Sequence, residues 1–170
     1  MPVNQFHTLN TERLFLREIR LNDAEEIFRL RADERVNALI DRQTAISVDD
    51  ATAFIQKILA NSANNEGVMW VITLIGNPQL IGTITYWHIE WENNKAEIGY
   101  EMLPEYQGQG IMTEALKKVI EFGFSGLGFK TIMADPKAIN TRSVKLLEKL
   151  GFEKTGEIEN GYLIYSLSII

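Results

Sequence analysis

The sequence predicts a mixed α/β domain, and three observations support that fold class. Segments in which apolar and polar residues alternate, as in strands, are interspersed with segments whose apolar residues recur at helical spacing. Two glycines within residues 107–110 lead directly into a helix-forming run, which indicates a strand–loop–helix unit at the centre of the chain. A length of 170 residues is enough to bury one core, so we expect a single domain over residues 1–170.

The first elements follow from alternation and from capping residues. Residues 14–19 alternate apolar and polar side chains and predict a strand. Asn22 or Asp23 can cap a first helix that follows them. Ser47 and Asp50 resemble a capping box that opens a second helix, whose apolar side carries Ala51, Phe54, Ile55, Ile58 and Leu59.

The rest of the chain predicts a β region followed by two strand–helix units. Residues 68–75 and 80–89 predict a hairpin about a turn at residues 76–78, and residues 95–103 predict the next strand. The remaining elements are a helix at about 112–122, a strand at 131–135, a helix at 141–150 stopped by Gly151, and a hairpin of residues 152–158 and 162–169 about Asn160-Gly161. The predicted order is therefore β-α-α-β-β-β-α-β-α-β-β.

Composition excludes several kinds of site. The chain has no cysteine, which excludes disulfides, thiolate metal sites and a cysteine nucleophile. His7 and His88 are its two histidines, and we expect each to be structural, so no metal site is predicted. No apolar stretch approaches the roughly 20 residues of a membrane helix, and residues 1–5 lack the regions of a signal peptide. We therefore expect a cytoplasmic protein with no membrane partner.

The charge distribution points to an anionic ligand more than the total charge does. A net charge of −6 argues against binding nucleic acid through a broad basic face. Residues 107–150 nevertheless carry seven basic residues against four acidic ones, so this segment is +3 and the rest of the chain is −9. Two interpretations remain open: a chance clustering on solvated helix faces, or a local site for an anion.

The glycine loop supplies a reason for such a site. The first N–H groups of a helix have no partner within it, and they bind an anion that side chains do not obstruct. Gly108 and Gly110 remove that obstruction and allow positive φ angles. A Walker A loop is excluded because Ile111 follows Gly110 where lysine is required, and a Rossmann fingerprint because Thr113 replaces its third glycine.

Four motifs resemble the GNAT superfamily, the GCN5-related N-acetyltransferases. Gln107-x-x-Gly110-x-Met112 is similar to its Gln/Arg-x-x-Gly-x-Gly/Ala loop, although Met112 departs from the usual small residue. Residues 96–103 are similar to the family's central strand, and residues 140–152 to its second cofactor motif. Residues 11–17, Thr-Glu-Arg-Leu-x-Leu-Arg, resemble the start of the ribosomal-protein N-acetyltransferase (RimJ/RimL-type) branch.

This resemblance implies a fold and a reaction. The fold is a central, mostly antiparallel sheet flanked by about four helices, with two strands splayed apart at the cofactor site. The reaction is direct transfer of acetyl from acetyl-coenzyme A (acetyl-CoA) to a primary amine, without a metal, by a protein that can form homodimers. The implied cofactor-binding residues are Met102, Leu103, Gln107, Gly108, Gln109, Gly110, Ile111, Met112, Thr113, Asn140 and Ser143.

Catalytic roles are assigned in the same way. Glu101 is the candidate base, acting through a water, with a substrate-orienting role as the alternative. Ser143 is the candidate acid for the leaving thiolate, with helix capping as the alternative for Ser143 and Asn140. Tyr162 and Tyr165 stay open as the acid.

Two further groups of residues have both a functional and a structural interpretation. Four lysines can bind the 3′-phosphate or simply be solvated: Lys117, Lys118, Lys145 and Lys149. Three aromatic residues can line an acceptor groove or only pack: Tyr86, Trp87 and Trp91.

The acceptor is the least determined part of the reaction. An α-amino group has a pKa near 8 and a lysine amine near 10.4, so deprotonation at pH 7 costs about 1.4 and 4.6 kcal/mol respectively. A single carboxylate suits the first, which favours the N-terminal α-amino group of a protein, such as a ribosomal protein. A small amine or polyamine, or a non-catalytic acetyl-CoA sensor, are the alternatives.

Overall fold

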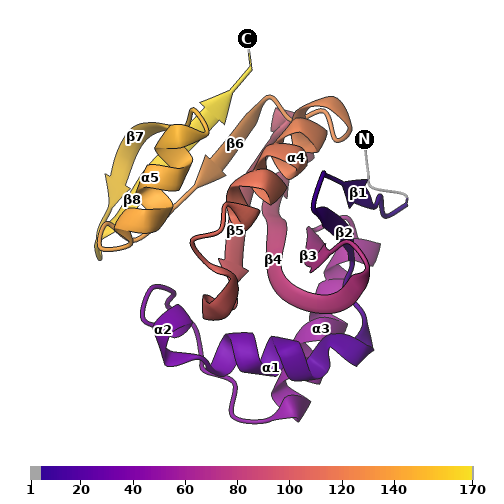
Figure 1. The fold of residues 1–170 in the computed structure, drawn as a ribbon. Helices are drawn as coiled ribbons and strands as arrows, with labels where there is room; N and C mark the ends of the chain where they lie inside the picture. Colours follow the sequence, from indigo (N-terminus) through magenta and orange to yellow (C-terminus); the bar gives the residue numbers. More distant parts are fainter. Residues whose placement is uncertain (1–4, 170) are drawn as a thin grey trace.

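A computed structural model describes residues 5–169; residues 1–4, on which part of the signal-peptide argument rests, and residue 170 lie outside the described residues. One sheet of eight strands organises this part of the chain, in the order β1-β2-β3-β4-β5-β6-β8-β7 (Figure 1). The pairs are antiparallel except for β5 and β6, which are parallel. The strands are β1 (Leu9–Asn10), β2 (Leu14–Glu18), β3 (Val68–Leu74), β4 (Asn77–Glu90), β5 (Lys95–Met102), β6 (Thr131–Ala134), β7 (Glu153–Ile158) and β8 (Tyr162–Ser168).

Helices cover both faces of the sheet. They are α1 (Ala24–Ala32), α2 (Glu34–Asn37), α3 (Val48–Ala63), α4 (Ile111–Ser125) and α5 (Thr141–Lys149). Because successive strand residues point to opposite faces, the neighbours Trp70 and Val71 of β3 belong to two separate cores. The core of Trp70 includes residues of α4 and α5, and the core of Val71 includes residues of α1 and α3. Figure 1 shows the two groups of helices on opposite sides of the central strands.

The sheet opens between β5 and β6. The two strands pair only at their starts, from Lys95 with Thr131 to Glu97 with Met133. Beyond Glu97, β5 continues for five residues to Met102, whereas β6 pairs with β8 and carries the chain towards α5 (Figure 1). The predicted mixed fold with splayed strands is therefore confirmed, and the open edge of β5 is the foundation of the site.

The structure differs from the sequence prediction in its shortest elements and in one cap. β1 and α2, of two and four residues, were not predicted because so few residues show no periodicity. Asp23 lies at the N-cap position of α1, but its carboxylate accepts hydrogen bonds from the buried Arg17 at 2.7 and 2.9 Å instead of capping the helix. Ser47 does cap α3.

No helix within residues 5–169 combines the length and the apolar character that crossing a membrane would require.

Candidate active site

A cavity of about 740 Å³ lies where β5 and β6 separate. Residues of α2 and of the turn after it line the cavity. Most of the predicted site residues also line it: Glu101, Met102, Gln107, Gly108, Gly110, Ile111, Met112, Thr113, Asn140 and Ser143. Leu103 and Gln109 are not in this lining. Leu103 is buried, its N–H donates to Ile81 O and its carbonyl accepts from Tyr106 N–H, so both backbone groups are engaged within the protein.

The loop between β5 and α4 has the backbone conformation that its glycines suggested. Gly108 and Gly110 adopt φ angles of 76° and 74°, which residues with a Cβ rarely take. α4 begins at Ile111, and its first internal hydrogen bond runs from Glu114 N–H to Gly110 O at 3.1 Å. The N–H groups of residues 111–113 therefore precede the helical bonding pattern.

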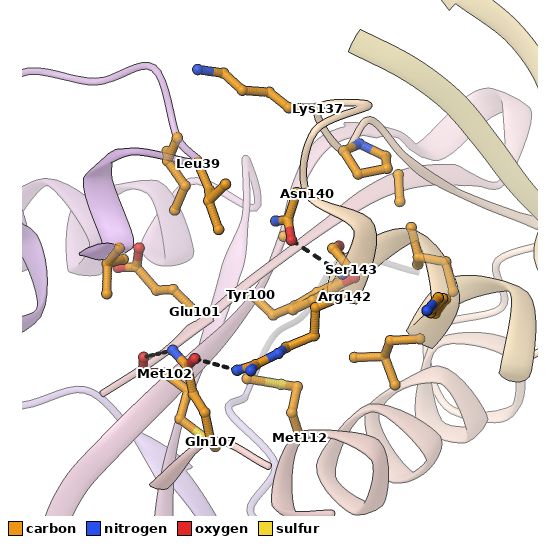
Figure 2. A pocket seen from close by; sticks show the side chains of 18 of the residues that line it. Leu39, Tyr100, Glu101, Met102, Gln107, Met112, Lys137, Asn140, Arg142 and Ser143 are labelled. Atoms are coloured by element: carbon orange, nitrogen blue, oxygen red, sulfur yellow. Dashed lines mark hydrogen bonds between the residues drawn. The ribbon is translucent and has the colours of Figure 1, made fainter. Parts of the chain in front are cut away.

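The same loop has room for an anion. Among the described residues, no atom lies within 4 Å of the place where a Cβ at Gly108 would stand. Met112, the unusual member of the motif, is half-buried and packs against the core of Trp70. Figure 2 shows its side chain directed towards Arg142 on α5. At Gly110 the corresponding place lies 3.5 Å from a guanidinium nitrogen of Arg13. Both glycines line the cavity, and the open space at Gly108 fits the pyrophosphate of a coenzyme A.

Gln107 connects the two walls of the cavity. Its Nε2 donates to the carbonyl of Met102 at 2.9 Å, and its Oε1 accepts from Nη1 of Arg142 at 2.6 Å (Figure 2). Arg142 was not predicted as a site residue. Together with Lys145 and Lys149 it lies on one face of α5, at helical spacing, and all three line the cavity. Of the four candidate lysines, Lys117 and Lys118 of α4 are not in the lining.

Ser143 has a partner that the sequence prediction missed. Its hydroxyl lies 2.6 Å from the hydroxyl of Tyr100, and either oxygen can donate. Burial raises the pKa of Tyr100 to about 12, although the hydrogen bond from Ser143 acts in the opposite direction. Asn140 Oδ1 accepts from the Ser143 N–H at 3.2 Å, which confirms the capping role of Asn140 and leaves its amide N–H groups for a ligand (Figure 2).

The two other candidate tyrosines are bound elsewhere. Tyr165 donates its hydroxyl to Glu148 at 2.9 Å and is not in the lining of the cavity. Tyr162 lines the cavity but donates its hydroxyl to Asp41 at 2.5 Å. Lys137 reaches the other oxygen of Asp41 at 2.5 Å, so the turn after α2 is connected to the loop before α5.

Glu101 lies on the face of β5 opposite to Tyr100 and Ser143. It forms an ion pair with Arg42, whose Nη1 lies 2.5 Å from Glu101 Oε2, and the two side chains are only 12% and 11% exposed. Burial raises the pKa of Glu101, while the positive charges of Arg42 and Arg31 oppose that rise without cancelling it. Arg42 itself is held by Asn37 Oδ1 and the Leu30 carbonyl.

Because side chains alternate between the two faces of β5, the Glu101 carboxylate and the Tyr100–Ser143 hydroxyl pair lie on opposite faces of the strand. Tyr100 and Glu101 are neighbours on a strand, so their side chains point to opposite faces, as Figure 2 shows. The edge of β5 that faces the splay lies between them. A reacting group placed at this edge can therefore be approached by Glu101 from one side and by the Tyr100–Ser143 pair from the other.

The three aromatic candidates divide into one lining residue and two packing residues. Trp87 is 43% exposed, lines the cavity and lies across Gly99, where a Cβ would come within 3.1 Å of its ring. Tyr86 is fully buried and donates to the Val119 carbonyl at 3.1 Å. Trp91 packs against Phe129.

Comparisons with known proteins identify the family of this chain. The family described as an acetyltransferase (GNAT) domain matches residues 13–153. The chain is 36% identical over 151 residues to an uncharacterized N-acetyltransferase, YoaA, of Bacillus subtilis, covering 89% of this chain and 85% of that protein. It is 29% identical over 83 residues to the spermidine N(1)-acetyltransferase of Escherichia coli, covering 49% of this chain and 45% of that protein.

The solved structures include ribosomal-protein acetyltransferases of the RimJ/RimL type. RimL, a ribosomal L7/L12 α-N-protein acetyltransferase solved with coenzyme A, superposes with a TM-score of 0.85 over 96% of this chain and 98% of its own. Its sequence identity of 20% means that this likeness shows the shared fold. The family match and the YoaA relative show that this chain belongs to the GNAT family and is an N-acetyltransferase.

Proposed function

We propose that the protein transfers acetyl from acetyl-CoA directly to the N-terminal α-amino group of a protein, such as a ribosomal protein. One observation carries the proposal. A single cavity brings together an accessible glycine loop at the start of α4, the buried carboxylate of Glu101 and the Tyr100–Ser143 hydroxyl pair. These are the groups needed to bind a phosphorylated acyl donor, to take a proton from an amine and to return one to a thiolate.

The described residues provide a place for each part of acetyl-CoA, which supplies an activated acetyl thioester. The backbone N–H groups of residues 108–113 would bind the pyrophosphate at the positive end of α4. The basic face of α5 would hold the 3′-phosphate, since Arg142, Lys145 and Lys149 line the cavity. The amide N–H groups of Asn140 would bind the pantetheine arm.

The reaction follows from the two faces of β5. The amine nitrogen forms a bond to the acetyl carbon and the bond from that carbon to sulfur breaks, giving an amide and a thiolate. Glu101 accepts the proton of the amine through a water, and burial raises the pKa of Glu101, which makes it a stronger base than an exposed carboxylate. The Ser143 hydroxyl, paired with Tyr100, protonates the thiolate; Ser143 then regains a proton from solvent and Glu101 releases its proton to solvent. No covalent enzyme intermediate is needed.

The charges at the acceptor end bear on the choice between an α-amino group and a polyamine. Three carboxylates line the cavity: Asp41 is paired with Lys137, Glu101 is paired with Arg42, and Asp135 lies beside Glu97. At Asp41 and Glu101 a second ammonium group on the acceptor would have to displace a cation, whereas at Asp135 it would not. Leu39 and Ile40 line the same end of the cavity and would contact an apolar group beside the reacting amine.

The similar acetyltransferases include enzymes named for each of the two acceptor classes, a protein N-terminus and a polyamine. RimL is named for α-N-acetylation of a ribosomal protein, and the Escherichia coli relative for spermidine. The pairing of Glu101, the candidate base, with Arg42 favours the first, whereas Asp135 is the lining carboxylate that a polyamine could use. A cytoplasmic location, a homodimer and the lack of nucleic-acid, membrane and metal partners stay predictions.

A thiol-release assay with acetyl-CoA and a panel of amines tests the proposal. The panel holds peptides with a free N-terminus, the same peptides blocked at the N-terminus but carrying lysine, and spermidine. We expect thiol release above the rate without acceptor for the free N-termini and little for the other two. Turnover of spermidine alone would replace the proposed acceptor, and binding of acetyl-CoA without release for any amine would indicate a sensor.

A further inference from the structure

Residues 11–13, the start of the motif that resembles the RimJ/RimL branch, lie beside the glycine loop although 96 to 103 positions separate the partners in sequence. The hydroxyl of Thr11 donates to Glu114 Oε1 at 2.6 Å. The backbone N–H of Arg13 donates to the same oxygen at 2.9 Å, and Arg13 Nε donates to Glu114 Oε2 at 2.6 Å. The proposed reaction does not use Thr11, Arg13 or Glu114.

Glu114 anchors this segment to the start of α4. It lies in the first turn of the helix, where the helix dipole favours a carboxylate, and its side chain is 21% exposed. Burial acts to raise the pKa of Glu114, but the hydrogen bonds from Thr11 and Arg13 hold it below its ordinary value. A carboxylate that accepts three hydrogen bonds fixes the position of Arg13 much better than an exposed single contact would.

The guanidinium of Arg13 reaches from this anchor to the loop itself. Its Nη1 donates to the carbonyl of Gln109 at 3.0 Å. In a planar trans peptide the C=O and the next N–H point in opposite directions. The carbonyl of Gln109 is directed at Arg13, so the N–H of Gly110 is directed away from it, and Gly110 lines the cavity.

We propose that Arg13 is a positioning residue for the pyrophosphate loop, orienting the Gln109–Gly110 peptide so that the Gly110 N–H faces the phosphate groups. The proposal rests on the proposed function only in taking coenzyme A as the ligand. Arg13 acts through the loop, and its anchor, Glu114, acts through Arg13. Gln109 thus takes part through its backbone carbonyl, while its side chain donates to the Glu105 carbonyl at 3.1 Å and is not in the lining.

The geometry requires an arginine and not only a positive charge. Arg13 uses Nε towards Glu114 and Nη1 towards Gln109 at the same time. Lysine has one nitrogen at its tip and cannot occupy both positions. Arg13→Lys keeps the positive charge, which could attract a phosphate, but loses the two simultaneous contacts that position the loop. The substitution therefore distinguishes the two roles of Arg13.

Calorimetric binding of coenzyme A and of pantetheine, which lacks the pyrophosphate, tests the proposal without turnover. We expect Arg13→Lys and Arg13→Gln each to weaken coenzyme A about 10- to 100-fold and to leave pantetheine within about twofold of the wild type. Acetyl transfer should respond in parallel, with kcat/KM reduced for acetyl-CoA and unchanged for S-acetylpantetheine. Glu114→Gln, which keeps Arg13 but weakens its anchor, should give a smaller loss of the same kind.

Arg29→Gln is the matched control. Arg29 pairs with Glu105 at 2.6 Å and is 51% exposed, against 2.6 Å and 45% for Arg13, but it donates to no residue of the loop at 107–110. It should leave coenzyme A binding unchanged. Rescue by Arg13→Lys, or an equal loss for coenzyme A and pantetheine, overturns the proposal.

The two proposals fail in different ways. If coenzyme A binding depends on Arg13 as described but no amine is acetylated, the proposed function fails and the role of Arg13 stands. If amines are acetylated and Arg13→Gln binds coenzyme A normally, the role of Arg13 fails and the proposed function stands. A melting temperature for each variant shows whether a substitution has unfolded the protein, in which case Glu114→Gln decides.

Discussion

Arg42 donates a hydrogen bond to Glu101 at 2.5 Å from a position 59 residues earlier in the chain, and the pair is almost buried at the acceptor end of the cavity. An opposite charge at this distance stabilises the carboxylate, whereas burial destabilises it. Burial is the larger effect, so the pKa of Glu101 stays above its ordinary value. Arg42 therefore limits how far the pKa of the candidate base rises.

Arg42→Gln should move the pH dependence of the reaction. Without the guanidinium the pKa of Glu101 rises further, and the base becomes deprotonated only at higher pH. We expect the acid limb of kcat/KM to shift to higher pH, and by less in Arg42→Lys, which keeps the charge. The measurement is a pH profile of thiol release.

The amine also titrates in this profile, so it is repeated with an acceptor of different pKa. If the acid limb moves with the pKa of the acceptor, it reports the titration of the amine. If it moves when Arg42 is substituted, it reports the titration of Glu101. Profiles that superpose for the wild type and both Arg42 variants would show that Glu101 is not the base.

Glu101→Gln should reduce turnover much more than donor binding. The amide keeps the size of the side chain but cannot accept the proton, so kcat should fall about 10²- to 10⁴-fold while the affinity for coenzyme A changes little. Single-turnover kinetics and calorimetric titration of coenzyme A measure the two quantities. Unchanged kcat would leave Glu101 only the substrate-orienting role.

The Tyr100–Ser143 pair allows the acid to be identified. We expect Ser143→Ala to lower kcat about 10- to 100-fold, and Tyr100→Phe, which removes only the partner hydroxyl, to lower it less. A thioester whose thiol has a lower pKa needs less protonation as it leaves, so it should restore much of the activity of Ser143→Ala. The reverse order of the two variants would assign the acid to Tyr100.

The sequence predicted the elements that have strong local signals. α4 is long and periodic, β3 is a nearly continuous apolar run, and the turn at Asn160-Gly161 has φ angles of 76° and 80°, which this residue pair favours. The two loop glycines were also predicted with the right physical reason. Tyr100 could have been found, because the period of a strand places it opposite Glu101 and therefore on the side of α4 and α5.

Arg42 and Arg142 could not have been found in the same way. Arg42 lies in an irregular segment after α2, and its contact with Glu101 depends on how that segment folds back over the sheet. Arg142 is one of several basic residues on α5, and only the packing of α5 beside the loop shows that it reaches Gln107. Long-range contacts of this kind have no signal in residue spacing.

Asp135→Asn should stabilise the protein at neutral pH. Burial, followed by a hydrogen bond and repulsion from Glu97, raises the pKa of Asp135 to about 7 from an ordinary value near 3.8. Between these values the native state holds a proton that the unfolded state has lost, so the stability of the wild type falls as the pH rises through this window. The asparagine cannot ionise and escapes that loss.

We expect the advantage of Asp135→Asn to be small near pH 4, to grow up to about pH 7 and to stay constant above it. After a discount for partial exposure it amounts to about 1 kcal/mol, or about 2–4 °C in Tm. Glu97→Gln should give part of the same gain, and the double variant less than the sum of the two. Melting curves of equal pH dependence in the wild type and Asp135→Asn would contradict the pKa shift.

Gly108→Ala and Gly128→Ala separate the backbone requirement of the loop from its role in binding. Both glycines have positive φ, 76° and 77°, and among the described residues no atom lies within 4 Å of the Cβ that either substitution would add. Each variant should therefore lose a similar stability, about 1 kcal/mol, from the strained backbone alone. Gly108 lines the cavity, so we expect only its variant to weaken coenzyme A binding, by about tenfold or more, because the methyl group or the altered φ displaces the backbone N–H groups of the loop.

Thermal melts and coenzyme A titrations of the two variants check both expectations. Equal losses of stability with equal binding would mean that the glycines of the loop serve the turn and not the pyrophosphate.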